Sequence, residues 1–148
     1  EKTSRRIRHE LIHYILNFSY YNLPPWIDEG LAQYFENSRF FGGRSRAINK
    51  SLIKILLKAT IDDLETLVIH PSGRKLTRTQ YIYSLGLVAF LKDYRQKGFY
   101  PIFEYLGRVN SGISSREDFC ASFDSYPDNL FENWQIWLNS LSQDLLLD

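Results

Sequence analysis

The sequence of 148 residues contains one cysteine, no methionine and three histidines, and its net charge is only +1. A single cysteine, Cys120, cannot form a disulfide within the chain or build a metal site alone. We therefore expect Cys120 to act as a small, buried apolar residue. The balanced charge argues against a nucleic-acid partner. No apolar run approaches the roughly 18 residues that span a bilayer, so we expect no transmembrane segment.

The start of the chain lacks targeting features as well. No signal peptide is visible, and a chain without methionine begins at Glu1. We therefore expect that part of the protein precedes Glu1. The residues at hand predict neither a compartment nor an oligomeric state.

The chain does contain enough apolar material for one folded domain. Hydrophobic residues make up 44% of it and aromatic residues 16%, which is typical of a globular protein. A chain of this length can form one core but not two. We therefore expect a single domain over residues 1–148.

Hydrophobic periodicity predicts a mainly α fold. The first helix is expected from Ser4, which can cap it, to about Tyr21, and Pro24 and Pro25 then end it and start a second helix that runs to about Asn37. The apolar residues of the first helix are Ile7, Leu11, Tyr14, Ile15 and Phe18. Further helices are expected over about 46–58, 62–67, 79–95, 101–106 or a little beyond, 115–123 and 128–141. No segment has the period-two alternation of a strand.

The motif His9-Glu10-Leu11-Ile12-His13 carries the chemistry. Residues four apart on a helix differ by about 40° in direction, so both imidazoles face one point and can bind one Zn²⁺. Glu10 is turned by about 100° from His9, so it can reach a metal-bound water more easily than the metal itself. Because zinc lowers the pKa of bound water toward roughly 7, Glu10 can act as the general base.

The second helix offers a third ligand, Glu29, which we expect in its first turn. Two helices joined by a short proline-containing loop pack antiparallel, so the start of the second lies beside the middle of the first. Gly30 permits close packing of the helices, and Trp26 would form a wall of the site. Three protein ligands plus water make the open type of zinc site that is typical of catalysis.

These two motifs, His-Glu-Leu-Ile-His at 9–13 and Pro-Trp-Ile-Asp-Glu-Gly-Leu-Ala-Gln-Tyr-Phe-Glu at 25–36, resemble those of the gluzincin zinc metallopeptidases. This family includes thermolysin, the aminopeptidase N group and the bacterial peptidase MA-like proteins, and the resemblance is loose over most of the remaining chain. It implies hydrolysis of peptide or protein substrates, with His9, His13 and Glu29 binding one Zn²⁺ and Glu10 as the base. Residues 1–38 would form the metal-binding helix pair and 39–148 the helical remainder of a zincin catalytic domain. Gluzincins place a small β-sheet before the metal helix, and we expect this sheet to be missing here.

The resemblance also implies a tyrosine, on the long later helix, that stabilises the oxyanion. A phenol donor aimed at the developing charge is what a tetrahedral intermediate needs. Tyr81 and Tyr83 are both candidates and point to nearly opposite faces of a helix. We favour Tyr81 because Ser84, Phe90 and Leu91 then fall in the family's register.

Two questions stay open at this point. Zinc-bound histidines usually donate their second nitrogen to an acceptor, and Gln33, Asp28 and Glu36 are all candidates. The alternative function is a catalytically silent, zincin-like helical module for binding or scaffolding. Such proteins usually lose the base or a ligand, whereas all four residues are present here, which favours the enzyme.

Overall fold

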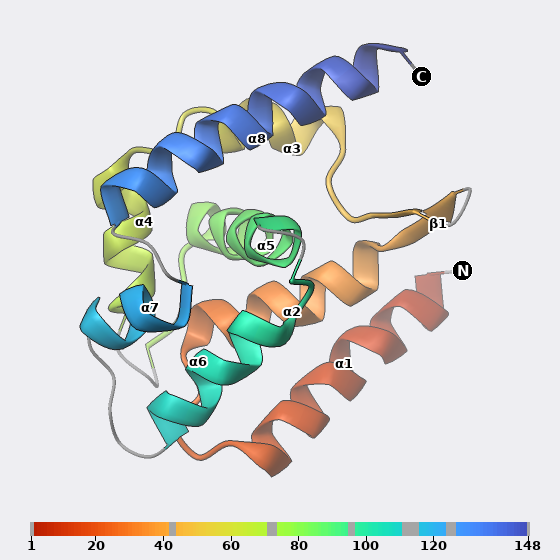
Figure 1. Ribbon diagram of the computed structural model, residues 1–148. Helices are drawn as coiled ribbons and strands as arrows, with labels where there is room; N and C mark the ends of the chain where they lie inside the picture. The colour runs from red at the N-terminus through yellow and green to blue at the C-terminus, as the bar shows by residue number, and fades with distance from the viewer. Residues whose placement is uncertain are drawn as a thin grey trace.

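The computed structural model describes residues 2–41, 44–70, 74–94, 97–110, 116–123 and 127–147. The fold of these residues is mainly α, which confirms the predicted class (Figure 1). The elements are α1 (Lys2–Ser19), α2 (Pro25–Asn37), β1 (Arg39–Phe41), β2 (Arg44–Arg46), α3 (Lys50–Leu56), α4 (Ile61–Val68), α5 (Arg78–Asp93), α6 (Tyr100–Asn110), α7 (Arg116–Phe123) and α8 (Pro127–Leu147).

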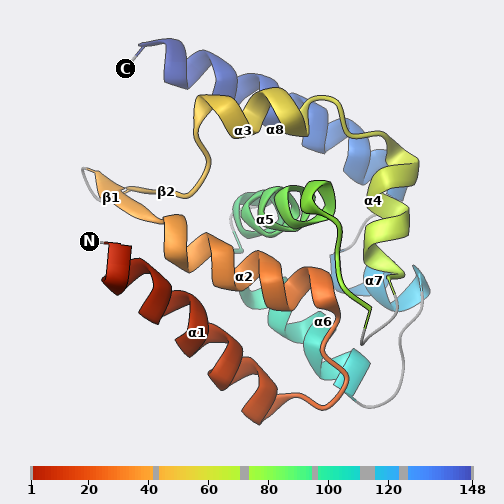
Figure 2. The ribbon, with the colours of Figure 1, turned by 180° about the vertical axis from the view of Figure 1, so that it is seen from behind.

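Helix α5 passes through the middle of the molecule, and the other helices are arranged around it (Figures 1 and 2). Every residue from Tyr83 to Leu91 is buried, so α5 is covered on all faces rather than along a single apolar stripe. Its start is fixed by a capping box, in which Thr77 and Gln80 each accept a hydrogen bond from the other's backbone N–H.

Helices α1 and α2 run side by side in opposite directions, as predicted for two helices joined through Pro24 and Pro25 (Figures 1 and 2). Pro25 occupies the first turn of α2. A backbone N–H at this position would have no carbonyl partner within the helix, so proline loses no hydrogen bond there. Helix α2 packs against α1 on one side and against α5 on the other. It therefore connects the motif on α1 with the centre of the fold.

A short hairpin corrects the prediction that the chain has no strand. Strand β1 pairs with β2 in antiparallel register, with Arg39 opposite Arg46. Strands of three residues are too short for a period-two pattern to be recognised. Because Arg46 belongs to β2, the third helix does not begin there. It begins at Lys50, where the Asn49 side chain accepts a hydrogen bond from the backbone N–H of Leu52.

Three smaller predictions also change. Ser4 does not cap the first helix, because α1 already includes Lys2. Helix α6 continues beyond Leu106 to Asn110. Cys120 is half-buried rather than buried. Ser115, where the next helix was expected to begin, lies outside the described residues.

The apolar residues of α1 face solvent. The residues concerned, Ile7, Leu11, Tyr14, Ile15 and Phe18, are between 48% and 84% exposed. Leu16 is the one residue of α1 that is buried among those whose burial is described. The face of α1 that meets α2 carries the two histidines, so helical periodicity alone did not identify the packed face. None of the described helices combines the length and apolar composition needed to cross a membrane.

Gly30 sets the distance between α2 and α5. A Cβ at this position would lie 2.6 Å from the carbonyl oxygen of Ser84 and 2.6 Å from Cγ2 of Val88. Because real Cβ atoms do not come this close to backbone, we expect Gly30→Ala to lower the free energy of unfolding by about 1–3 kcal/mol. Denaturant unfolding measures this change.

Gly107 on α6 is the matched control for this prediction. A Cβ there would have no neighbour within 4 Å, so Gly107→Ala should raise the free energy of unfolding by about 0.5–1 kcal/mol through the helix propensity of alanine. Equal stability of the two variants would contradict the close approach at Gly30.

Candidate metal centre

His9, His13 and Glu29 meet between α1 and α2. The two Nε2 atoms lie 3.0 Å apart, and the Glu29 oxygens lie 4.0 Å from Nε2 of His9 and 3.9 Å from Nε2 of His13. Within the part of the chain that the structure describes, these three residues are the one group able to hold a metal ion. Glu29 starts the second turn of α2, slightly later than the first turn that we predicted.

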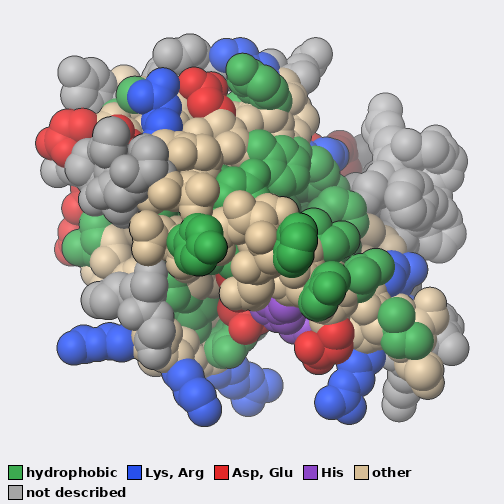
Figure 3. Space-filling model, turned by 90° about the horizontal axis from the view of Figure 1, so that it is seen from below, with side chains coloured by type: hydrophobic (Ala, Val, Ile, Leu, Met, Phe, Trp, Pro, Cys, Tyr) green, Lys and Arg blue, Asp and Glu red, His purple; other side chains and the backbone are tan. Residues whose placement is uncertain are grey.

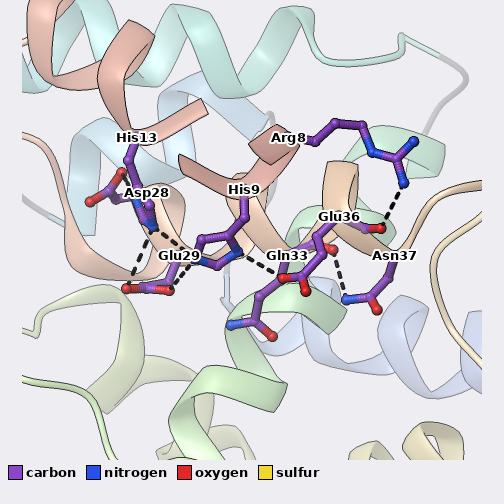
Figure 4. A network of polar contacts seen from close by, with 8 residues as sticks. All are labelled: Arg8, His9, His13, Asp28, Glu29, Gln33, Glu36 and Asn37. Atoms are coloured by element: carbon purple, nitrogen blue, oxygen red, sulfur yellow. Dashed lines mark hydrogen bonds and ion pairs between the residues drawn. The ribbon is translucent and has the colours of Figure 1, made fainter. Parts of the chain in front are cut away.

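Each histidine has a carboxylate beside its other ring nitrogen (Figure 4). Nδ1 of His13 lies 2.6 Å from Oδ1 of Asp28 and is hydrogen-bonded to it. Nδ1 of His9 lies 2.8 Å from Oε2 of Glu36, although the alignment departs from that of a good hydrogen bond. Asp28 and Glu36 are thus the side chains beside the second ring nitrogens, a choice that the sequence left open among three candidates. Gln33 contributes only its backbone carbonyl, which accepts a hydrogen bond from Asn37.

This pairing makes the cluster suitable for a cation. A carboxylate beside Nδ1 favours the tautomer with its proton on Nδ1, so the lone pair is left on Nε2. Two Nε2 lone pairs that face each other at 3.0 Å repel unless a proton or a cation lies between them. In a tetrahedral zinc site two nitrogen ligands are about 3.3 Å apart. The two Nε2 atoms would therefore need to move apart by only a few tenths of an ångström. The residues therefore fit a zinc ion.

Burial raises the pKa of the Glu29 carboxyl above its ordinary value, and the negative charge of Asp28 adds to this effect. The nearby His13 and His9, together with a hydrogen bond from Tyr81, act in the opposite direction. A carboxylate that has lost part of its hydration gains more from a neighbouring cation than an exposed one does. The environment of Glu29 therefore suits a metal ligand.

Tyr81, and not Tyr83, lies at the cluster. The Tyr81 hydroxyl faces the Glu29 carboxylate, and burial together with the Glu29 charge raises the pKa of the phenol. The phenol is therefore protonated at neutral pH and can donate. Tyr83 is 7% exposed, and the pKa of its phenol is raised by burial and by the charge of Asp63 on α4. Two residues apart on a helix means about 200° of rotation, so only one of the two tyrosines can face the site.

Glu10 lies on α1 between the two histidines, and its side chain is exposed. Among the described residues, none forms an ion pair or hydrogen bond with its carboxylate. Figure 3 shows that the histidines reach the surface, with acidic side chains on either side of them and hydrophobic side chains on the same face.

One other sequence interpretation changes at this site. Trp26 does not form its wall, because the indole is fully buried and packs against Tyr105 and Phe119 on the other side of α2. The third histidine, His70, follows α4, is half-buried and does not belong to the cluster. The side chain that stands beside the cluster from α5 is Tyr81.

Comparison with known proteins adds no family. No protein-family model matches the chain, and neither a curated protein nor a solved structure matches it. The case for a metal centre therefore rests on the two motifs and on the geometry described above.

Proposed function

We propose that this protein is a zinc-dependent peptidase that cleaves peptide bonds with a metal-activated water. The observation that carries the proposal is the convergence of His9, His13 and Glu29, with Tyr81 beside them and Glu10 on the same helix as the histidines. The resemblance of both motifs to those of the gluzincins supports the same function.

The proposed roles follow from the chemistry of each side chain. His9, His13 and Glu29 would hold one zinc ion, which when bound polarises the scissile carbonyl and lowers the pKa of a water. Glu10 accepts a proton as the water oxygen bonds to the carbonyl carbon. It then passes this proton to the amine as the C–N bond breaks. Tyr81 donates a hydrogen bond to the carbonyl oxygen as negative charge develops there.

Metal analysis combined with a cleavage assay tests this proposal. We expect the purified full-length protein to bind one zinc ion per chain and to cleave peptides in a random, unstructured mixture, with products read by mass spectrometry. A His13→Ala variant should bind less zinc and show no cleavage, because two protein ligands remain instead of three. Absence of bound zinc from the unaltered protein under zinc-replete conditions would contradict the site.

A binding or scaffolding module is the second candidate function, and the exposed apolar side chains of α1 favour it. Apolar patches of this kind commonly mark surfaces that meet a partner. This function predicts stoichiometric zinc without peptide cleavage by the full-length protein. Cleavage that depends on zinc and on Glu10 would exclude it.

A further inference from the structure

Glu36 occupies an unfavourable place for a carboxylate. It lies in the last turn of α2, which ends at Asn37, at the end of the helix where the helix dipole is negative. The contact from Arg8 does not neutralise the side chain, because the guanidinium donates to the backbone carbonyl of Glu36 (Figure 4). Local helix energetics therefore do not account for a glutamate at this position.

The Glu36 side chain instead lies against His9. Its Oε2 is 2.8 Å from Nδ1 of His9. That nitrogen is shielded from solvent and has no well-formed hydrogen bond in the described structure, so water cannot easily take the place of the carboxylate. Among the described residues, Glu36 is the one group found beside this nitrogen.

Helix α2 thus supplies one candidate ligand and two carboxylates that flank it. Asp28 precedes Glu29 directly and serves His13, whereas Glu36 follows about two turns later and serves His9. Gln33 lies one turn after Glu29, between the two carboxylates, but it does not contact either imidazole with its side chain. Gln33, which lies one helical turn after Glu29, is therefore not the residue beside His9.

We propose that Glu36 is the positioning residue of His9 in the metal centre. It holds the proton of His9 on Nδ1 and directs Nε2 toward Glu29 and His13. This role rests on the proposed zinc site and deepens it. Partners of this kind typically change metal affinity by 10–100-fold.

A graded series of substitutions tests this role. Zinc affinity is measured by competition with a chromophoric chelator for the unaltered protein, Glu36→Gln, Glu36→Ala and Gln33→Ala. We expect about 10–100-fold weaker binding for Glu36→Ala. Glu36→Gln should have an intermediate affinity because its amide oxygen can accept a hydrogen bond but carries no negative charge, and Gln33→Ala should bind as the unaltered protein does.

Two further measurements separate positioning from a purely structural role. Nitrogen-15 NMR of the imidazoles should show the Nδ1–H form of His9 depleted in metal-free Glu36→Ala and retained in Gln33→Ala. The unfolding temperature of metal-free Glu36→Ala should stay within about 3 °C of the unaltered protein, because its helix position is unfavourable to the carboxylate.

Unchanged zinc affinity in Glu36→Ala would overturn the proposal, and so would a loss of affinity matched by a large fall in unfolding temperature. A different result would contradict the proposed peptidase function. If the unaltered protein binds zinc but cleaves no peptide, while affinity still depends on Glu36, then the positioning role stands and the catalytic function does not.

Discussion

Replacing Glu10 with glutamine is expected to reduce kcat for peptide cleavage by about 10²–10⁴-fold while zinc remains bound. Glutamine matches glutamate in size but cannot take a proton from water, so only the general base is lost. The Glu10 side chain is exposed, so the substitution should not disturb packing. The measurements are kcat on the random peptide mixture and the zinc content of the same preparation.

Glu132→Gln is the matched control, since Glu132 is an exposed glutamate on α8. It should change neither cleavage nor metal content. Cleavage by Glu10→Gln at a rate near that of the unaltered protein would show that another group accepts the proton. Loss of zinc from Glu10→Gln would instead place Glu10 among the ligands.

Replacing Tyr81 with phenylalanine is expected to lower kcat by about 10²–10³-fold with little change in KM. The hydroxyl is the donor proposed to meet the developing negative charge, and the ring itself stays in place. Because Tyr81 also interacts with Glu29, zinc affinity should be measured in the same variant. Affinity near that of the unaltered protein would assign the loss of rate to the oxyanion.

Tyr83→Phe is the control for this prediction, because Tyr83 is buried away from the cluster on the other side of α5. It should leave kcat unchanged. A fall in kcat for Tyr83→Phe, together with normal activity of Tyr81→Phe, would reverse the choice between the two tyrosines.

The parts of the site that are local in sequence could be predicted without a structure. Helical geometry alone places His9 and His13 one turn apart on the same face. Pro24 and Pro25 end one helix and begin the next, so Glu29 on the second can return beside the first. The mainly α class followed from the same periodicity.

The choice among candidates required the tertiary structure. Asp28, Gln33 and Glu36 all lie on α2, and only the rotation of α2 against α1 decides which carboxylate meets which imidazole. Tyr81 and Tyr83 could be separated only once α5 was placed beside Glu29.

The dependence on tertiary structure also explains the predictions that were wrong. Trp26 was assigned to the site, but it faces Tyr105 and Phe119 in the core. The apolar residues of α1, such as Leu11 and Phe18, form a regular helical pattern yet remain exposed. The sequence by itself determined the helices, the histidine pair and the third residue of the cluster, because these depend on spacing along one helix or across one short turn. Only the tertiary structure decided which faces meet, because that depends on how helices far apart in the sequence cross and rotate against one another.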